Sequence, residues 1–518
     1  MVNGIENYLL GMDCGTTNIK AVILGEDGSL VAQASRPNCF ISPGPGMQEQ
    51  DATVWWKNSV EIFRSLCDQA GEEIVRRIRG ICISSHTVSM LPVDAQGNPL
   101  RNAMTYQDSR SAPELQEILD TVGRENFIRI VGGQPAAGFL PSKILWFKRH
   151  EPQLFAKTAA FLQASSYINY QLTGKMTTDI DQASRTQCLD MSTLEWSKEI
   201  AQAIDVDLDQ LIPSLKLVNE IIGTVTPEAA AITGLCSGTP VVAGCSDAMA
   251  SMYAMGLSRL GEAGESSGTS SLVFVGSSCK SRPDVPVVTK PCSITGMPWI
   301  FDAPITTTGR ALQWYIDTFA AQERAEAAKQ EKNIYAYLNE QALQAPAGSN
   351  GLIFYPYLMG ERAPLWEDYA RSMFVGMSIS TTRAELTRAV FEGTAYALRH
   401  VLETVAQSGA QAKLLRVTGG GSKSRTWSRI KASMLHMPVY VLSETSGNVP
   451  VGDALIAGNS VGVFQDLSEA ADRLVKVEEI IEPDDAWAAA YDKYYPYYVD
   501  IYRSVDQYMK NLNQIRSN

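Results

Sequence analysis

Residues 8–37 read YLLGMDCGTTNIKAVILGEDGSLVAQASRP and predict the start of a β-sheet. Apolar, β-branched runs at 8–14 and 19–25 are separated by the turn residues GTTN, and a second turn, EDG, precedes the run at 29–37. This pattern predicts three strands that meander through two turns. Asp13 places a carboxylate inside the first run, where an ionised side chain is costly unless a group such as a cation pairs with it.

The next segments predict an α/β domain. Apolar residues at helical spacing lie between Asp51, a candidate N-cap, and Gly71, a candidate stop, and 78–86 reads as a buried strand. Strands followed by helices and again by strands make an α/β fold the first choice.

A similar turn recurs after the middle of the chain. The sequence SGTSS at 267–271 precedes an apolar, β-branched run, much as GTTN does near the start. Two such turns indicate two related halves, and the glycine-rich connection between Gly256 and Gly261 predicts the boundary. The expected domains are 1–258 and 259–518.

The second half contains further periodic segments. Strands are expected at 414–421, which ends in three glycines, and at 438–443, and a strand, a turn and a helix are expected across 238–256. A tyrosine-rich helix at 484–509 is interpreted as a packing element. The remaining expected helices lie at 306–319, 381–405 and 422–435.

Composition and charge exclude several classes of protein. The 518 residues are 45% hydrophobic and 19% charged, which is typical of a soluble globular chain with more than one core. The formal net charge is −12 and no basic run could follow a phosphate backbone, so nucleic acid is not an expected partner. Nine cysteines without a Cys-x-x-Cys pair and only four histidines argue against a disulfide framework and a zinc site. With no signal-peptide pattern and no long apolar run, we expect a cytoplasmic protein without membrane spans.

The Gly-Thr turns predict phosphate binding. Gly15 permits close approach of a ligand, and the hydroxyls and N–H groups of Thr16 and Thr17 can donate to phosphate oxygens. Phosphate would bring Mg²⁺, which needs only one or two carboxylates and would pair with Asp13. The alternative is that Asp13 only caps a tight turn. Gly268, Thr269 and Ser270 repeat this pattern of a glycine followed by two hydroxyl-bearing residues. Both turns could therefore bind one polyphosphate.

A third glycine-rich segment predicts a nucleoside platform. Gly419, Gly420 and Gly421 end a strand, and a helix is expected to start near Ser422, which leaves unpaired N–H groups and open space. The alternative is a plain turn at the start of a helix. Neither a P-loop spacing nor a G-x-G-x-x-G between strand and helix explains these glycines.

Transfer of phosphate to a hydroxyl requires a general base, and Asp247 is the best candidate. It follows a buried strand and precedes a helix rich in small residues; the alternative role is the N-cap of that helix. The acceptor site is predicted at His86, Thr87, Gln107 and Asp108, whose groups suit a polyol. His86 could instead be a structural histidine, and Asp108 could form a structural ion pair with Arg110.

Together these segments resemble the FGGY carbohydrate kinases, the family of xylulokinase, glycerol kinase and gluconokinase. The resemblance covers nearly the whole chain, and residues 372–392, SMFVGMSISTTRAELTRAVFE, are similar to the second family signature at every position. The first signature departs from the pattern only at Leu140. The other segments that carry the resemblance are MDCGTTNIKAV, GMQEQDATVWW, KILWFKRHEP, AGCSDA, SGTSS and RVTGGGSKS.

The resemblance implies an α/β fold of two ribonuclease-H-like, actin-like ATPase domains that close over ATP and a sugar in an interdomain cleft. It implies that Asp247 is the general base and that Asp13 is the Mg²⁺-linked carboxylate. It also implies ATP contacts at a set of residues in both halves. These are Thr16, Thr17, Thr269, Gly309, Gly420, Gly421 and Arg425.

Two departures bear on the acceptor. Thr87 and Val88 occupy the pair that is Met-His in bacterial xylulokinases and Arg-Glu in glycerol kinases, and Ala248 replaces the Asn that usually follows the xylulokinase base. We expect a ketose such as xylulose or another pentulose. The alternative is a polyol or an aldonate such as gluconate, and an aldonate would need a cation such as Arg110 or Arg185.

Two other classes of function stay open beside a sugar kinase. A sugar-independent ATPase switch would share the fold, and a catalytically silent sugar-binding regulator is opposed by the presence of both Asp13 and Asp247. The sequence leaves a homodimer open.

Overall fold

The computed structural model describes residues 5–282, 285–292, 294–444 and 446–517. Contacts divide the chain into two compact units, and each is described by itself. The first comprises Met1–Ser258, Lys290–Pro298 and Gly447–Val475, and the second comprises Arg259–Thr289, Trp299–Ser446 and Lys476–Asn518. The main division thus falls between Ser258 and Arg259, but two segments of the expected second domain group with the first unit.

A six-stranded sheet forms the centre of the first unit, with the order β13-β14-β5-β1-β2-β3. β1, β2 and β3 pair antiparallel through the two predicted turns, while β5 and β14 run parallel to β1. The predicted meander is therefore confirmed. The strands are β1 (Tyr8–Cys14), β2 (Asn18–Gly25), β3 (Leu30–Pro37), β5 (Ile78–Ser85), β13 (Ile221–Thr224) and β14 (Pro240–Val242).

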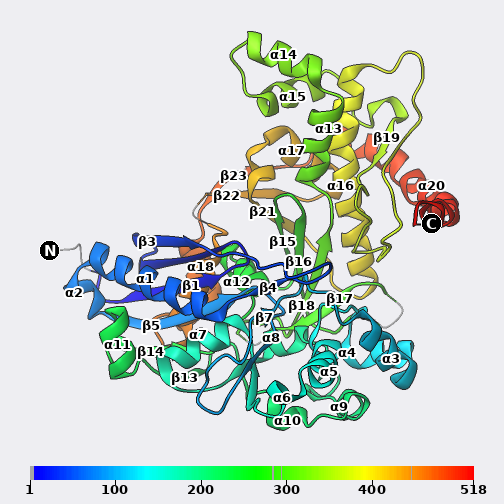
Figure 1. Ribbon diagram of the computed structural model, residues 1–518. Helices are drawn as coiled ribbons and strands as arrows, with labels where there is room; N and C mark the ends of the chain where they lie inside the picture. The colour runs from blue at the N-terminus through cyan, green and yellow to red at the C-terminus, as the bar shows by residue number, and fades with distance from the viewer. Residues whose placement is uncertain (1–4, 283–284, 293, 445, 518) are drawn as a thin grey trace. The chain divides into compact units, whose positions relative to one another are not determined.

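Helix α1 (Ala52–Ala70) packs against β2 and β3 (Figure 1). Asp51 caps it by accepting a hydrogen bond of 2.8 Å from the N–H of Thr53, and Gly71 ends it with a φ of 80°. Both ends agree with the prediction. Its apolar face contributes Trp55 and Phe63 to the core.

Helices α12 (Asp247–Ala254) and α18 (Val449–Ser460) pack against each other, and α18 also lies against β1 and β5. A second core within this unit gathers the helices at 112–155 and 198–211. The remaining elements of the unit are β4 (Glu49–Gln50), α2 (Glu72–Val75), β6 (Leu91–Val93), β7 (Ala103–Met104), α3 (Ala112–Val122), α4 (Arg124–Val131), α5 (Leu140–His150), α6 (Pro152–Phe155), β8 (Ala160–Leu162), α7 (Ala164–Thr173), β9 (Thr178–Asp179), α8 (Ile180–Arg185), β10 (Leu189–Asp190), β11 (Glu195–Trp196), α9 (Lys198–Ile204), α10 (Leu208–Leu211), β12 (Leu215–Lys216), α11 (Pro227–Thr233) and α19 (Leu467–Leu474).

The second unit repeats the strand arrangement of the first. Its sheet has the order β17-β18-β16-β15-β21-β22-β23, in which β15, β16 and β18 form an antiparallel meander and β21 and β22 run parallel to β15. The order β18-β16-β15-β21-β22 thus matches β3-β2-β1-β5-β14, as expected for two related halves. The strands are β15 (Glu262–Ser267), β16 (Ser271–Ser277), β17 (Val288–Pro291), β18 (Trp299–Ile305), β21 (Leu414–Thr418), β22 (Val439–Leu442) and β23 (Val477–Ile481).

The longest helices of the second unit are α16 (Arg383–Gln407) and α20 (Asp485–Ser517). The interpretation of the tyrosine stripe as packing is confirmed, since Tyr491, Tyr495 and Tyr498 of α20 are buried in a core cluster. The other elements are α13 (Gly309–Thr318), α14 (Ala321–Lys329), α15 (Ile334–Ala342), the 3-10 turn η1 (Ser349–Gly351), β19 (Ile353–Tyr355), β20 (Met373–Val375), the 3-10 turn η2 (Gly420–Lys423) and α17 (Arg425–Leu435).

One helix start differs from the prediction. The expected start near Ser422 was wrong by three residues, because Gly420–Lys423 form a 3-10 turn and α17 begins at Arg425. Ser424 is the N-cap, and its hydroxyl accepts a 3.0 Å hydrogen bond from the N–H of Trp427. A serine cap therefore sets the boundary.

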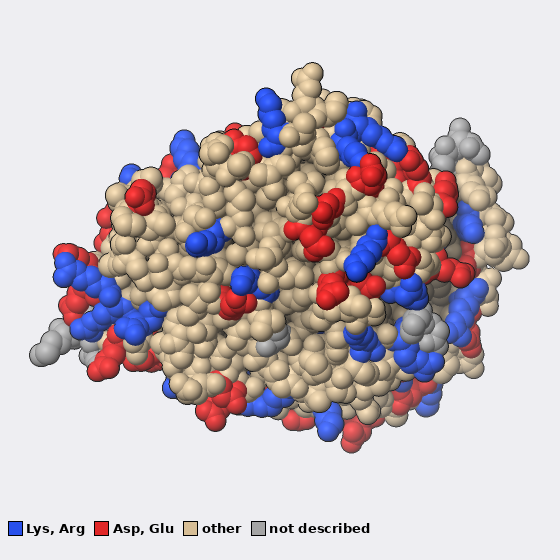
Figure 2. Space-filling model, turned by 90° about the horizontal axis from the view of Figure 1, so that it is seen from below, with Lys and Arg blue, Asp and Glu red and all other residues tan. Residues whose placement is uncertain are grey.

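Charged side chains are interspersed over the face shown in Figure 2, where basic and acidic residues alternate without a continuous basic area. This distribution agrees with the net charge and with the absence of basic runs in the sequence. Among the described residues, no helix is both long enough and apolar enough to cross a membrane.

Candidate functional site

The first Gly-Thr turn is held by side chains that bind its carbonyl groups. The Asn38 side-chain amide donates to the carbonyl of Gly15 at 3.0 Å, and the Gln50 amide donates to that of Thr16 at 2.8 Å. The backbone N–H groups of residues 15–17 donate no hydrogen bond to another described group. In this turn the carbonyl groups accept hydrogen bonds from the protein, while the N–H groups have no acceptor among the described residues. Such free N–H groups can bind an anion. Sequence reasoning missed Asn38 and Gln50, whose role depends on a long-range contact.

Asp13 lies in β1 and is buried under this turn, and it does not cap it. Its Oδ1 atom is buried without a hydrogen-bond partner, and a Cβ added to Gly15 would lie 3.2 Å from Oδ2. Burial raises the pKa of Asp13 well above its ordinary range, the charge of Asp247 adds to this, and Lys20 opposes it. The unpartnered oxygen of Asp13, beside an anion-binding turn, could hold a divalent cation, which would supply positive charge for a bound phosphate.

Asp247 is the first residue of α12 and follows Ser246, which forms an isolated β-bridge with Ser85 beyond the end of β14. The capping role falls to Ser246, whose hydroxyl accepts from the N–H of Met249 at 3.2 Å, so the alternative role for Asp247 is not the one observed. The N–H of Ala248 donates to Oδ1 of Asp247 at 2.8 Å and orients the carboxylate. A carboxylate in the first turn of a helix is stabilised by the helix dipole.

The ends of two strands and the start of a helix lie side by side in the first unit. His86 donates its backbone N–H to the carbonyl of Cys14, and Ser85 pairs with Ser246 in a parallel bridge. The ends of β1 and β5 and the start of α12 therefore bring together Asp13, Thr87 and Asp247 as neighbouring segments of one sheet edge, where ligands bind in α/β sheets.

Two further polar residues fix this edge and were missed by sequence reasoning. Asp181 accepts hydrogen bonds from both the N–H and the hydroxyl of Ser246, at 2.9 and 2.5 Å. Gln182 accepts from the Thr87 hydroxyl at 2.5 Å and donates to the Ser85 hydroxyl at 3.0 Å. Both residues follow β9 at the start of α8, and only the fold brings them to the edge.

His86 has internal partners at both ring nitrogens. Nδ1 lies 3.0 Å from the carbonyl of Cys14, and Nε2 lies 2.7 Å from the hydroxyl of Ser89. Burial lowers the pKa of His86 to about 4, so the ring is neutral at pH 7. These contacts match the structural role that the sequence left open, while its contact with a sugar stays a prediction.

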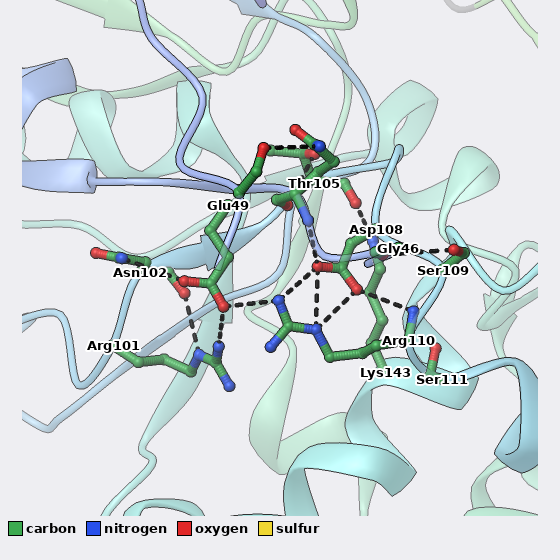
Figure 3. A network of polar contacts seen from close by, with 12 residues as sticks. Gly46, Glu49, Arg101, Asn102, Thr105, Asp108, Ser109, Arg110, Ser111 and Lys143 are labelled. Atoms are coloured by element: carbon green, nitrogen blue, oxygen red, sulfur yellow. Dashed lines mark hydrogen bonds and ion pairs between the residues drawn. The ribbon is translucent and has the colours of Figure 1, made fainter. Parts of the chain in front are cut away.

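Asp108 is the centre of the buried ion-pair network in Figure 3. The Arg110 guanidinium binds its carboxylate at 2.7 to 3.1 Å and also reaches Glu49 at 2.7 Å. Glu49 in turn contacts Arg101. The N–H of Gln48 donates to Asp108 at 2.8 Å. Asp108 and Arg110 thus form the structural ion pair that the sequence allowed, and Arg110 is engaged by two carboxylates.

Lys143 lies at the edge of this network (Figure 3) and is fully buried. Its ammonium donates to the carbonyls of Thr105 and Gly138 at 2.5 and 2.6 Å. Burial lowers the pKa of Lys143 to about 7, although the charge of Asp108 opposes the change. The lysine therefore ties the loop around Thr105 to α5. Of the predicted acceptor residues in this region, Gln107 is exposed and donates to the Tyr106 hydroxyl at 3.1 Å.

In the second unit, the second Gly-Thr turn contacts the start of α13. The N–H of Gly309 donates to the carbonyl of Gly268 at 3.0 Å, and the N–H of Arg310 donates to that of Thr269 at 3.0 Å. A Cβ added to Gly309 would lie 2.4 Å from the carbonyl oxygen of Gly268, so only glycine permits this approach.

A cavity of about 1010 Å³ opens beside this turn. It brings together five predicted nucleotide residues, while Arg425 is not among the lining residues and instead pairs with Glu479 at 2.7 Å. The sequence analysis did not predict the aromatic and amide side chains that also line the cavity. The predicted residues are Gly268, Thr269, Gly309, Gly420 and Gly421, and the added walls include Trp314, Tyr335, Asn339, Phe391 and Trp427.

The cavity suits a flat ligand with an anionic end. Aromatic walls can stack on a planar ring system, and the Tyr335 hydroxyl holds Gln313 at 2.6 Å so that this wall is ordered. The Asn339 side chain accepts from the Ser424 hydroxyl at 2.6 Å and anchors α15 to the start of α17. At the other side, the N–H groups of Thr269, Gly420 and Gly421 donate to no described group, so they could donate to an anion.

Comparison with known proteins gives consistent matches over nearly the whole chain. The N-terminal domain model of the FGGY family of carbohydrate kinases matches residues 8–254, and the C-terminal domain model matches residues 265–461. The xylulose kinase of Bacillus subtilis (strain 168) is 28% identical over 507 residues, which cover 98% of either chain. The gluconokinase of Bacillus licheniformis is 26% identical over 530 residues and 99% of either chain.

A solved structure agrees with these matches. The xylulose kinase from Rhodospirillum rubrum superimposes with a TM-score of 0.88 at 30% sequence identity. The alignment covers 97% of this chain and 100% of that chain.

Proposed function

The chain belongs to the FGGY family of carbohydrate kinases, and we propose that it transfers the terminal phosphate of Mg-ATP to a hydroxyl of a ketose, such as xylulose or another pentulose. The family consists of enzymes that phosphorylate sugars and has the actin-like ATPase fold, so the predicted fold class and the predicted enzyme class are confirmed. The nucleotide, the cation and the sugar are the parts that the proposal adds.

The observation that carries the proposal is the position of Asp247. Ser246 takes the cap of α12 and Ala248 orients the Asp247 carboxylate, so the acid is fixed at the start of α12, near Asp13 and the anion-binding turn at Gly15. We propose that Asp247 accepts the proton of the attacking sugar hydroxyl and orients its oxygen. Asp181 keeps the segment in place by binding Ser246.

We propose nucleotide-binding roles for residues in each unit. The cavity of the second unit would take the nucleoside, with stacking on its aromatic walls, and the turn at Gly268 would contact phosphate oxygens. Thr16 and Thr17 would donate to phosphate oxygens from the first turn. Asp13 would hold Mg²⁺, which when bound neutralises charge that develops on the phosphoryl group. Asn38 and Gln50 keep the turn in the shape that this requires.

A ketose fits the acceptor site better than an aldonate. An aldonate carboxylate would need a cation, and both candidate arginines already bind acids. Arg110 pairs with Asp108 and Glu49, and Arg185 donates to Asp181 at 2.9 Å. The alternative of gluconate or a polyol is supported by the similarity to a gluconokinase.

A coupled ATPase screen tests the proposal. The protein with Mg-ATP would be assayed for ADP release with xylulose, ribulose, gluconate, glycerol and no acceptor. We expect release that depends on a pentulose, with the sugar phosphate detected by mass spectrometry. Dependence on gluconate or glycerol alone would replace the proposed acceptor with the alternative. ATP turnover that is indifferent to every acceptor would favour an ATPase switch and refute the kinase assignment for these substrates.

A further inference from the structure

A third carboxylate lies next to Asp13 and Asp247 in the first unit. Asp453 belongs to α18, more than 400 residues from Asp13 in the chain, and its side chain is completely buried. α18 is part of the segment Gly447–Val475, which groups with the first unit. Nothing in the local pattern around Asp453 pointed to this position.

Two glycines allow α18 to approach the site closely. A Cβ added to Gly11 of β1 would lie 1.9 Å from the carbonyl oxygen of Pro450, and one added to Gly452 would lie 1.9 Å from that of Ala250 in α12. Asp453 follows Gly452 directly. It is therefore held where α18 contacts both the strand that carries Asp13 and the helix that begins with Asp247.

Ser84 links Asp453 to Asp13. The Ser84 hydroxyl donates to Oδ2 of Asp453 at 2.7 Å, and Ser84 is the register partner of Asp13 in the parallel pair of β1 and β5. Paired residues of neighbouring strands project from the same face of a sheet, so Asp13 and Ser84 both face α18. In agreement, burial and then the charges of Asp13 and Asp247 raise the pKa of Asp453.

A purely structural role does not account for this acid. The described contacts of Asp453 are the Ser84 hydroxyl and, at 3.9 Å, the Cys82 thiol, and no Lys, Arg or His of the described residues forms an ion pair with it. A single hydroxyl donor does not offset the cost of burying a carboxylate. Asp13 and Asp453 are two buried acids that form no ion pair with a Lys, Arg or His of the described residues, and a cation would offset their charge.

We propose that Asp453 is a positioning residue of the divalent-cation site, where its carboxylate supplies negative charge behind Asp13 and orients the edge of β5 through Ser84. The inference rests on the proposed function, because that function assigns the cation to Asp13. Within the described residues, no three acidic, cysteine or histidine side chains are placed to coordinate one ion together. This agrees with a hydrated Mg²⁺, which takes one or two carboxylates and keeps several waters.

Direct cation binding tests the inference. Mn²⁺ would be titrated into the full-length protein with saturating ADP and followed by electron paramagnetic resonance of the free ion. Asp453→Asn keeps an oxygen that can accept from Ser84 but removes the charge. We expect Mn²⁺ to bind this variant about 10-fold to 100-fold more weakly, the usual range for groups behind a metal ligand. ADP without metal should bind the variant and the parent protein equally.

Two further variants control the experiment. Asp466→Asn makes the same charge change at the exposed N-cap of α19, in the same segment, and should leave Mn²⁺ affinity unchanged. Ser84→Ala removes the hydroxyl that orients Asp453 and should weaken Mn²⁺ binding by a smaller factor. If Asp453→Asn does not fold, as judged by circular dichroism and thermal unfolding, Ser84→Ala decides the question.

The outcomes separate this inference from the proposed function. Parent-like Mn²⁺ affinity in Asp453→Asn, or in Ser84→Ala where that variant decides, overturns the inference even if the parent protein phosphorylates a pentulose. Weak Mn²⁺ binding in Asp453→Asn supports the inference even if no sugar is phosphorylated. In that case only the proposed acceptor chemistry fails.

Discussion

Glu361 of the second unit should make the stability of the protein fall as pH rises toward neutrality. Its side chain is 3% exposed, and Oε1 accepts from the N–H groups of Thr306 and Arg362 at 2.6 and 2.8 Å. Oε2 is buried and has no partner among the described residues. Burial raises the pKa of Glu361 from its ordinary value of 4.5 to about 7, and the hydrogen bonds only partly oppose this.

The sign follows from proton binding. Between pH 4.5 and 7, the folded protein keeps a proton on Glu361 that the unfolded chain has already lost, so raising the pH favours unfolding. Each pH unit in this window is worth about 1.4 kcal/mol, which gives a loss of about 3 kcal/mol across it. Above pH 7 the contribution of this group becomes constant.

Glu361→Gln tests this reasoning, because glutamine keeps an oxygen for the two N–H groups but cannot ionise. The buried amide nitrogen adds a cost that does not depend on pH and cancels in the comparison. Relative to the parent protein, the free energy of unfolding of the variant should therefore rise by about 3 kcal/mol between pH 4.5 and 8. Urea unfolding at a series of pH values, followed by tryptophan fluorescence, measures this difference.

Glu478→Gln provides a matched control, since Glu478 is exposed on β23 and the chemical change is the same. The pH dependence of the difference between the two variants then measures the effect of burying the carboxyl group of Glu361. A difference between Glu361→Gln and the parent protein that is flat with pH, or that falls as pH rises, would refute the argument from burial.

The other predictions concern the proposed kinase. Asp247→Asn should bind ATP normally but lose about a hundredfold or more in kcat, the usual scale for a general base, and near-normal turnover would remove Asp247 from the mechanism. Asp13→Ala should shift the Mg²⁺ dependence of the rate to higher concentration; an unchanged dependence would remove the cation from Asp13. Gly421→Ala should weaken ADP binding in calorimetry, because the new Cβ would lie 2.3 Å from the Ser267 hydroxyl, and unchanged affinity would show that the turn adapts.

Local patterns predicted the first strands and their turns because both depend on neighbouring residues. The β-branched runs and glycine turns correctly predicted the meander at 8–37. Asp51 and Gly71 correctly predicted the two ends of α1. At Ser246 and Asp247, two adjacent residues can both cap a helix, and sequence alone does not choose between them. The fold decides, because Asp181 binds Ser246.

Contacts between distant segments were beyond local reasoning. No element was predicted at 449–460, and the sheet on which helix α18 packs depends on segments far away in the chain. Gly11 and Gly452 mark the contacts of α18 only once its partners are known. Arg425 was placed at the nucleotide by resemblance alone, and its pairing with Glu479 depends on β23 lying beside β22.

The repeated strand order allows the two Gly-Thr turns to be compared residue by residue, and they differ in the side chain two residues before the glycine. Asp13 stands two residues before Gly15 at the end of β1, and the matching position two residues before Gly268 at the end of β15 is Ser266. Their parallel partners also correspond, since Ser84 pairs with Asp13 and Thr418 pairs with Ser266. A hydroxyl at this position can donate to a phosphate but adds no charge to attract a cation. Under the proposed function, the acid beside the first turn would hold the cation, and the glycine-lined cavity beside the second turn would take the planar part of the nucleotide.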